Sequence, residues 1–283
     1  MKYNSLKYYL LLLLLLVAGT ATAFESDFEY TYCLKKGDIT SFIANKEFPM
    51  HSVMKFPQAL YVAHYLSTNG IPLSQEVVVE KDKLMHDTWS PMLKIEKNTF
   101  TYSELLALSL QQSDNNACDI LFKHCGKPKT VEKYIKSLGI KRISIKKTEQ
   151  QMHDNPECMN KNTCDDSAMV QLLEWFYDHH NDNEYLKYIW DLMLNCDTGK
   201  ERILAALPPE ASFLHKTGTG PKNKNSQYDA NDVGIILMPD GTHISIAIFT
   251  RNATSESDVA KVALGAFEAF KIGGFKLFEE SDK

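Results

Sequence analysis

The sequence predicts an α+β fold: an antiparallel sheet flanked by helices, with an all-helical lobe inserted into it. Three observations support this prediction. Strand-like runs occur near both ends of the chain, amphipathic helical patterns fill its middle, and one further helix follows the last strand. We therefore expect residues 24–50 and 201–283 to form a sheet lobe and residues 51–200 a helical lobe, with the active site at their junction.

The first residues have the pattern of an export signal. Lys2 and Lys7 precede an apolar run at residues 8–18, and small residues follow up to Ala23, after which we expect cleavage of residues 1–23. A retained membrane anchor is the alternative, but the run is shorter than the roughly 20 residues that span a bilayer. We expect a secreted, periplasmic protein without membrane attachment after cleavage.

Two strand-like runs follow at residues 28–34 and 39–44, and Lys36-Gly37-Asp38 between them predicts a hairpin turn. The helical lobe opens at Ser52, where apolar residues recur at helical spacing up to Gly70, although Pro57 requires a kink or a short first turn. Further helices are predicted at residues 103–110, 116–124, 130–138, 166–180 and 184–195.

The end of the chain returns to strand patterns. One strand begins at Phe213, two more are predicted at residues 232–238 and 243–250, and Pro239-Asp240-Gly241 forms the turn between the last two. A helix at residues 258–270 follows. The simplest architecture pairs the early hairpin with these late strands in one antiparallel sheet.

Composition and cysteine spacing exclude several functions. A net charge of −5 does not suit a nucleic-acid partner, and no Cys-x-x-Cys or His-Glu-x-x-His spacing predicts a metal site, so we expect no cofactor. Cys118 and Cys125 would lie about 10 Å apart along a helix, beyond the roughly 7 Å limit for a disulfide. Cys158 and Cys164, which flank a short polar loop, are better candidates. We expect a monomer.

Three short motifs carry chemistry because they occur together and in order: Ser52-Val53-Met54-Lys55, Ser113-Asp114-Asn115 and Lys216-Thr217-Gly218. A serine hydroxyl is a poor nucleophile at neutral pH unless a base takes its proton, and an amine one helical turn away is within reach. Each motif alone is weak, since Ser144-Ile145-Lys146-Lys147 repeats the first spacing in what reads as a charged loop. Together they predict a serine acyl-transfer site.

The first and third motifs supply a nucleophile and a binding edge. Ser52 is the candidate nucleophile, and its backbone N–H, together with that of Thr219, would stabilise an oxyanion. Without the other motifs, Ser52 would be interpreted as a helix cap and Lys55 as a surface charge. Lys216 offers a positive charge for a substrate carboxylate, and Gly218 lets the ligand approach the backbone.

The second motif and a tryptophan complete the expected cleft. Ser113 can pass a proton to a leaving nitrogen and Asn115 can hold a substrate carbonyl, whereas Asp114 caps the next helix. Thr217 belongs to the substrate-binding edge of the third motif. Trp89 would form an apolar wall of the cleft, although tryptophan is also a common core residue.

With these motifs, the chain resembles the class A serine β-lactamases, within the wider group of penicillin-recognising enzymes, for which the three motifs are an established signature. The likeness extends over residues 28–270, and residues 48–50, 88–91, 111–119 and 215–220 resemble the branch common in Bacteroides-type bacteria. The resemblance implies hydrolysis of the β-lactam amide, cephalosporins included, through a Ser52 acyl-enzyme, and hence antibiotic resistance.

Glu149 separates the nearest relatives. By resemblance, Glu149 activates the water that hydrolyses the acyl-enzyme, and His153 helps to hold that water. The alternative is a solvated loop glutamate beside a surface histidine. The sequence leaves open whether Lys55 or Glu149 takes the proton during acylation. The competing functions are a carboxypeptidase or transpeptidase, which would lack this carboxylate, and a drug-binding sensor that stays acylated.

The sequence departs from the family pattern in two places. Only residues 24–27 separate the signal from the first strand, so the family's N-terminal helix is expected to be missing and the enzyme to be less stable. That loss would reduce the apolar cover of three residues of the last helix: Val262, Phe267 and Phe270. In the loop after Glu149, Thr163 and Asp166 replace a tryptophan and a proline, and a disulfide between Cys158 and Cys164 would restore rigidity there.

Overall fold

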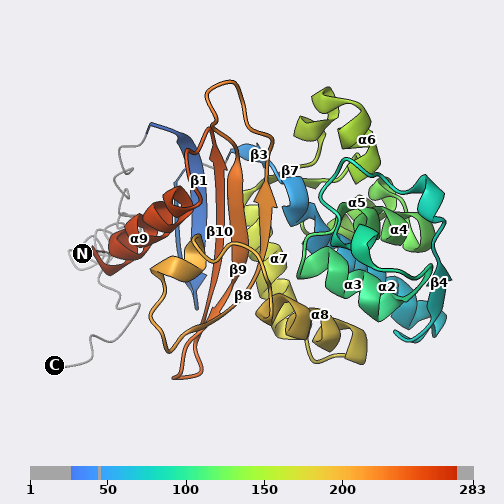
Figure 1. Cartoon of the computed structure of the whole chain (residues 1–283). Coiled ribbons are helices and arrows are strands. Elements are labelled where there is room, and N and C mark those ends of the chain that lie inside the picture. The colour runs from blue at the N-terminus through green and yellow to red at the C-terminus, as the bar shows by residue number, and fades with distance from the viewer. Residues whose placement is uncertain (1–26, 44–45, 273–283) are drawn as a thin grey trace, which may run out of the picture.

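The computed structural model describes residues 27–43 and 46–272 (Figure 1). The signal peptide expected at residues 1–23 lies outside this part of the chain, as do residues 24–26 and 273–283 of the expected sheet lobe. Within the described ranges, no helix is both long enough and apolar enough to span a bilayer.

A five-stranded antiparallel sheet, in the order β2-β1-β10-β9-β8, lies at the centre of the molecule. The first hairpin turns at Gly37, whose φ of +56° is a left-handed conformation that glycine adopts without steric cost. Strand β1 then pairs with β10, so the predicted joining of the early hairpin to the late strands is confirmed. The strands are β1 (Glu29–Lys36), β2 (Ile39–Ile43), β8 (Ser212–Thr219), β9 (Ala230–Leu237) and β10 (His243–Arg251).

Alternate residues of the sheet enter two separate apolar cores, because successive side chains of a strand point to opposite faces. Leu34 on β1 and Ile246 on β10 belong to the core beneath helix α9 (Ser257–Ile272), whereas Cys33 and Ala247 belong to the other. Figure 1 shows α9 on one side of the sheet and α7 and α8 on the other. These two helices are α7 (Asp166–His179) and α8 (Glu184–Leu194).

Helix α9 has a better covered apolar face than the sequence suggested. Val262, Phe267 and Phe270 are at most 3% exposed, so the expectation that they lack apolar cover is wrong. They face the sheet, and Leu264 on the outer side of the helix is instead exposed. The expected absence of a helix before β1 concerns residues 24–27, of which the structure describes Asp27 alone, and stays a prediction.

The helical region is built around α2 (Lys55–Asn69), most of whose residues are buried. Pro57 is the third residue of α2, where its missing N–H interrupts no helical hydrogen bond. A 3₁₀ helix, η1 (His51–Met54), precedes α2 and supplies the short first turn expected from Pro57. The other helices of the region are α3 (Tyr102–Leu110), α4 (Asn115–Cys125), α5 (Pro128–Ser137) and α6 (Glu149–Asp154).

Several short elements interrupt the predicted helical region. Segments of two to six residues are too short to reveal a period, which is why the sequence pattern did not predict them. Two small sheets pair β3 (Glu47–Pro49), β7 (Thr163–Asp165) and β6 (Ile143–Ser144), and β4 (Glu76–Val78) with β5 (Thr99–Thr101). The remaining 3₁₀ helices are η2 (Lys81–Lys83), η3 (Pro91–Lys94), η4 (Pro156–Lys161) and η5 (Ile203–Ala206).

All six cysteines are free, so the expected disulfide between Cys158 and Cys164 is wrong. Cys164 is the middle residue of β7, which pairs with β3 on one side and β6 on the other. Its thiol is completely buried and donates a hydrogen bond to the Asp165 carbonyl, 2.9 Å away. Cys158 is a half-buried residue of η4. Strand pairing therefore directs the Cys164 side chain into the core.

Candidate active site

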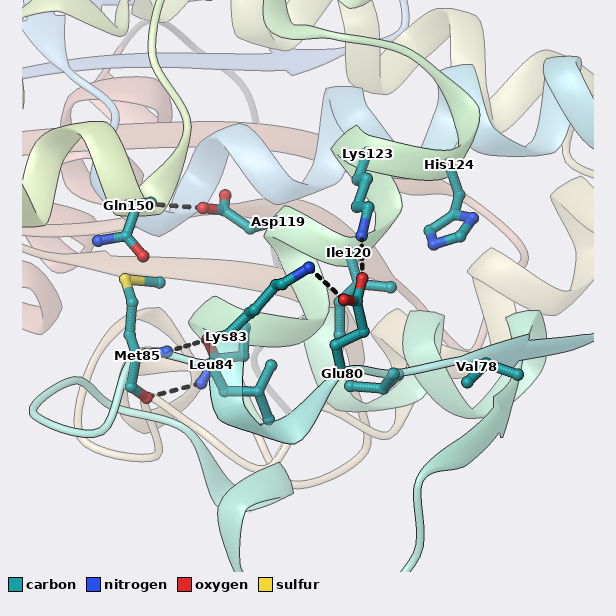
Figure 2. Close-up of a pocket in the computed structure, with 12 residues that line it drawn as sticks. Val78, Glu80, Lys83, Leu84, Met85, Asp119, Ile120, Lys123, His124 and Gln150 are labelled. Atoms are coloured by element: carbon teal, nitrogen blue, oxygen red, sulfur yellow. Dashed lines mark hydrogen bonds and ion pairs between the residues drawn. The ribbon is translucent and has the colours of Figure 1, made fainter.

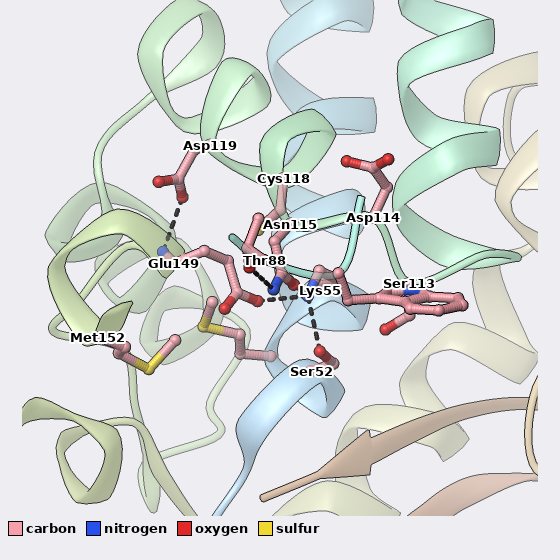
Figure 3. Close-up of polar contacts among 12 residues, drawn as sticks. Ser52, Lys55, Thr88, Ser113, Asp114, Asn115, Cys118, Asp119, Glu149 and Met152 are labelled. Atoms are coloured by element: carbon pink, nitrogen blue, oxygen red, sulfur yellow. Dashed lines mark hydrogen bonds and ion pairs between the residues drawn. The ribbon is translucent and has the colours of Figure 1, made fainter. Parts of the chain in front are cut away.

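Lys55 lies at the centre of the polar contacts that join the sequence motifs. Its Nζ donates to Ser52 Oγ at 2.7 Å and to Asn115 Oδ1 at 2.9 Å, and it forms an ion pair with Glu149 Oε1. Figure 3 shows these side chains converging from η1, α2, α4 and α6. Lys55 is completely buried at the start of α2, one residue after the 3₁₀ helix that carries Ser52.

The contacts of Lys55 define its protonation state. An ammonium group has three N–H donors, and the three acceptors around Nζ match that number. Burial by itself lowers the pKa of Lys55, but the Glu149 carboxylate beside it outweighs burial and raises that pKa above its ordinary value. Lys55 is therefore a cation at neutral pH, hydrogen-bonded to the hydroxyl of Ser52.

Glu149 is the first residue of α6, which the sequence predicted as a loop. Thr148 caps this helix through two reciprocal hydrogen bonds. Its hydroxyl accepts from the backbone N–H of Gln151, and the Gln151 side chain accepts from the backbone N–H of Thr148. Asp119 anchors the same helix end, since its two carboxylate oxygens accept from the backbone N–H of Glu149 at 2.8 Å and of Gln150 at 2.7 Å. The carboxylate of Glu149 is consequently fixed beside Lys55 and only 8% exposed.

Asp119 also borders a small, separate cavity lined mainly by residues of α4 and the segment around η2. Figure 2 shows its carboxylate turned toward Gln150, with Glu80, Lys83 and Lys123 forming an ion-paired cluster at the cavity mouth. The cavity volume is about 170 Å³, which is small for a ligand site. Burial raises the pKa of Asp119 to about 6, against the opposing effect of the two backbone hydrogen bonds.

The second motif forms the turn into α4. Ser113 has a φ of +58°, and its Oγ accepts a hydrogen bond from Lys216 Nζ at 2.9 Å. Asp114 caps α4 by accepting from Ala117 N at 2.8 Å, so its predicted capping role is confirmed. The side-chain nitrogen of Asn115 donates to Thr88 Oγ1 at 2.8 Å, which orients its oxygen toward Lys55.

The third motif lies on β8, at the edge of the central sheet. Lys216 is completely buried, and burial lowers its pKa to about 7. We expected Gly218 to admit the ligand, but a Cβ there would meet the Met50 carbonyl at 2.4 Å and Val53 at 3.1 Å. The missing side chain of Gly218 therefore makes room for the backbone that precedes Ser52, and its role in ligand binding stays a prediction.

Two adjoining cavities open over these residues. Their volumes are about 450 and 470 Å³, and Ser52, Trp89, Asn115 and Thr219 line both. The first is also lined by Ser113 and Thr217, and the second by Glu149, His153 and Met152. Trp89 is 65% exposed and therefore belongs to the cavity wall rather than to the core. The pair of cavities is large enough for a drug-sized ligand.

His153 contacts two carboxylates. Its Nε2 lies 2.9 Å from Asp87 Oδ1 and its Nδ1 lies 3.2 Å from Asp154 Oδ1. Hydrogen bonds to Asp154 and Asp87 raise the pKa of His153. The ring thus links α6 to the segment before Trp89 while lining the second cavity.

Arg202 is a cavity residue that the sequence interpretation missed. It is 2% exposed and donates to the Gly218 carbonyl at 3.0 Å and to Thr219 Oγ1 at 2.7 Å. Its Nε has no hydrogen-bond partner among the described residues. Arg202 places a fixed cation in the first cavity. A single arginine in a polar stretch gives no sequence signal, because its partners lie 16 or more positions away.

A chain of titratable side chains lies behind β8. His215 Nδ1 lies 2.8 Å from Asp232 Oδ1, and although burial opposes it, this carboxylate raises the pKa of His215 to about 10. Cys196 is a neighbour of His215, and its sulfur lies 3.3 Å from Thr198 Oγ1. Burial raises the pKa of Cys196, but the imidazolium more than offsets it and lowers that pKa to about 7.

No described cluster of three or more His, Cys, Asp or Glu residues is arranged to hold a metal ion. The reactive groups that the cavity presents are the serine, the lysines and the buried carboxylate described above. Their mutual distances are those of a nucleophile joined to a proton-transfer network.

Comparison with known proteins gives a consistent assignment. The sequence model of the β-lactamase enzyme family matches residues 24–269. The extended-spectrum β-lactamase PER-1 of Pseudomonas aeruginosa is 32% identical over 79% of this chain and 75% of its own, and a β-lactamase of Bacteroides uniformis is 32% identical over 83% of both. The solved structure of a class A β-lactamase from Bacteroides cellulosilyticus has a TM-score of 0.80 at 26% identity, covering 87% of this chain and 92% of its own. The chain therefore belongs to the β-lactamase enzyme family and is a class A serine β-lactamase, a hydrolase that acts on β-lactams.

Proposed function

We propose that the protein hydrolyses the β-lactam amide in two steps, with Ser52 as the nucleophile and a Glu149-activated water as the deacylating agent. One observation carries this proposal: a single buried ammonium, Lys55, is bonded to both the Ser52 hydroxyl and the Glu149 carboxylate. Nucleophile and general base therefore belong to one hydrogen-bonded unit.

In the first step, Ser52 Oγ bonds to the β-lactam carbonyl carbon and the ring C–N bond breaks. The raised pKa of Lys55 keeps it an ammonium, so we assign Glu149 as the base that removes the serine proton, with a water as relay. The leaving nitrogen takes a proton from Ser113, and Ser113 regains one from Lys216, whose Nζ donates to its Oγ. The serine proton then passes from Glu149 to solvent, and Lys216 takes one from solvent, so that Glu149 is again a carboxylate. In the second step, Glu149 takes a proton from a water that attacks the ester, and this proton goes to the Ser52 oxygen as the ester C–O bond breaks.

The remaining cavity residues bind and orient the substrate. The backbone N–H groups of Ser52 and Thr219 act as the oxyanion donors. The substrate carboxylate is attracted by the Arg202 guanidinium and by the protonated form of Lys216, and it accepts hydrogen bonds from cavity-lining hydroxyls. Asn115 contacts the substrate amide, Trp89 gives apolar cover, and His153 borders the deacylation side. Thr217 and Thr219 line the cavities, and the other two proposed binding residues, Lys216 and Gly218, lie next to them on β8.

Cephalosporins are the proposed substrate class, and resistance to them the proposed role. PER-1 is named an extended-spectrum enzyme, and two adjoining cavities leave room for the large side chains of such drugs. We also propose that residues 1–23 act as an export signal and that the mature protein works as a monomer in the periplasm, where β-lactams act on the cell wall.

Replacing the proposed base tests the mechanism. Wild-type protein mixed with a chromogenic cephalosporin is expected to turn it over repeatedly. Glu149→Gln should retain the Ser52 hydroxyl but lose about 10²- to 10⁴-fold in turnover, with a covalent adduct of one drug per protein accumulating in the mass spectrum. Ser52→Ala, the matched control, should form no adduct.

Other outcomes point to the competing functions. A wild type that stops after one equivalent would be a drug-binding sensor, and one that ignores the drug would contradict the proposal. Glu149→Gln with undiminished turnover would remove Glu149 from the mechanism and leave Ser52 in it.

A further inference from the structure

His51 holds a strained backbone immediately before the proposed nucleophile. Its φ is +48°, a left-handed conformation that a non-glycine residue keeps only where the surrounding structure imposes it. The His51 ring is only 7% exposed, and its Nε2 lies 2.9 Å from Asp229 Oδ2, a hydrogen bond in which the ring N–H donates to the carboxylate. This bond spans 178 residues of sequence.

Asp229 belongs to the segment that connects β8 to β9. It immediately precedes β9, and its backbone carbonyl accepts from Gly220 N at 2.8 Å, directly after the end of β8. The His51 ring fills the space beside Gly220, where a Cβ would meet His51 Nε2 at 2.8 Å. The ring therefore packs against the residue that follows Thr219.

A second set of contacts joins the backbone before Ser52 to strands β8 and β9. Asn231 Nδ2 donates to the Pro49 carbonyl at 2.8 Å, and the Met50 carbonyl occupies the space beside Gly218. These contacts hold the backbone before Ser52 against β8 and β9. The His51–Asp229 hydrogen bond joins the same segments on the side that faces the cavity, since His51, Thr219 and Gly220 all line the second cavity.

We propose that His51 and Asp229 form a positioning clamp that fixes the separation of the Ser52 and Thr219 backbone N–H groups. The clamp deepens the proposed function, on which it rests, because these N–H groups are its oxyanion donors. Neither side chain touches the reacting atoms in this mechanism. Their effect is geometric: a donor serves the transition state only near 2.7 to 3.1 Å from the oxyanion, and displacement of about 1 Å can cost on the order of 100-fold in rate.

Breaking the clamp should lower the reaction rate by the same factor at saturating drug concentration and at low drug concentration. His51→Ala and Asp229→Ala are each expected to lower kcat and kcat/KM for a chromogenic cephalosporin about 10- to 100-fold, with KM nearly unchanged, because the lost interaction is made in the transition state. His51→Gln, whose amide N–H can still reach the carboxylate, should retain most of the rate. The double variant should lose no more than either single one, since the two residues act as a unit.

A boronic acid that forms a tetrahedral adduct on Ser52 gives a readout that loss of stability alone would not change. Its inhibition constant should rise by the same factor as kcat/KM falls, at a temperature well below the melting point of each variant. His243→Ala is the matched control, because His243 Nε2 lies 3.0 Å from Glu174 Oε1 in a similar pair at the start of β10. This control should leave both rate and inhibition unchanged.

Wild-type rates and inhibition constants in both alanine variants would overturn the clamp, as would an equal loss in His243→Ala. A wild type that never acylates Ser52 would instead overturn the proposed function.

Discussion

At the scale of single residues, Cys196 is a thiol outside the catalytic unit whose chemistry is altered by its neighbours. Its thiol is half-buried, and the neighbouring imidazolium of His215, itself paired with Asp232, lowers the pKa of Cys196 to about 7. Near neutral pH a substantial fraction is therefore thiolate, the form that reacts with electrophiles. Cys196 also contacts Thr198, whose hydroxyl lies 2.6 Å from that of Thr217 in the cavity wall.

We expect iodoacetamide to label Cys196 before the other cysteines at pH 7, as followed by peptide mass spectrometry. The labelling rate should rise with pH around a midpoint near 7, because the thiolate is the reacting species. His215→Asn should remove the stabilising cation, move this midpoint upward and slow labelling at pH 7. Cys158 is the internal control, being half-buried as well. If Cys158 were labelled as fast as Cys196, the assignment of a thiolate would be wrong.

The sequence could predict those site residues that belong to short local motifs. Ser52, Lys55 and Asn115 were found because their order along the chain is itself the signal, and the structure brings them together. Arg202 and His51 were missed for the opposite reason. Their partners are 16 and 178 positions away, and a single basic residue has no pattern from which such a contact can be inferred.

At the scale of elements, α6 illustrates how tertiary contacts decide a local structure. Residues 149–154 read as a polar loop, and six residues are too few for a stable isolated helix. The cap of Thr148 and the carboxylate of Asp119, which comes from α4, satisfy the first N–H groups of α6. Helix α6 therefore forms because α4 supplies hydrogen-bond acceptors, and it carries Glu149 to Lys55.

Asp119→Ala should slow deacylation more than acylation. Without its anchor, the first turn of α6 loosens and Glu149 is misplaced by a fraction of an ångström. We expect this displacement to cost about 10-fold or more in deacylation, the step in which Glu149 activates the attacking water. Stopped-flow measurement should show a burst of product followed by a slow steady state.

Asp165→Ala is a control with similar structural disruption. Asp165 is likewise a buried cap, accepting from Ala168 N at 2.6 Å at the start of α7. It should lower the melting temperature without producing a burst. A burst in both variants would attribute the effect to general loosening rather than to α6.

Helix α7 joins the sheet through a hydrogen-bond chain. Thr31 Oγ1 on β1 lies 2.6 Å from both Asp166 Oδ2 and the Ile43 carbonyl. A single hydroxyl proton serves one acceptor, so a protonated Asp166 that donates to Thr31 satisfies the whole chain. Burial raises the pKa of Asp166 to about 6, in agreement with this arrangement.

Asp166→Asn should increase stability at neutral pH. Below about pH 4 the wild-type carboxyl is neutral in the folded and unfolded chains, and both proteins should respond to pH alike. Between about pH 4 and 6 the unfolded chain loses this proton before the folded one does, so the contribution of Asp166 falls by roughly 3 kcal/mol as the pH rises. The variant, whose amide can donate to Thr31, avoids that loss.

Urea unfolding of both proteins from pH 3.5 to 8 measures this difference. The free energy of unfolding of Asp166→Asn minus that of wild type should grow between pH 4 and 6 and then remain constant. A difference independent of pH would mean that Asp166 is ionised in the folded protein throughout this range.

At the scale of the whole molecule, the order of long periodic segments was enough to predict the architecture. Strands at both ends of the chain, with helices between them, leave few ways to bury every apolar face, and the predicted closing of the sheet is confirmed. The features that the sequence pattern could not predict depend on contacts between residues far apart in the sequence. Cys164 was assigned to a disulfide because its pairing with Phe48 and Ile143 in a three-stranded ribbon leaves no periodic trace.

The pairing of β1 with β10 has a consequence for biogenesis. Tyr32 pairs with Ile248 across the sheet, so β1 and β10 cannot pair until the residues of β10 have left the ribosome. Contacts this distant along a polypeptide form slowly. The export that we propose requires an unfolded chain at the inner-membrane channel, and late completion of the central sheet keeps the nascent chain in that form.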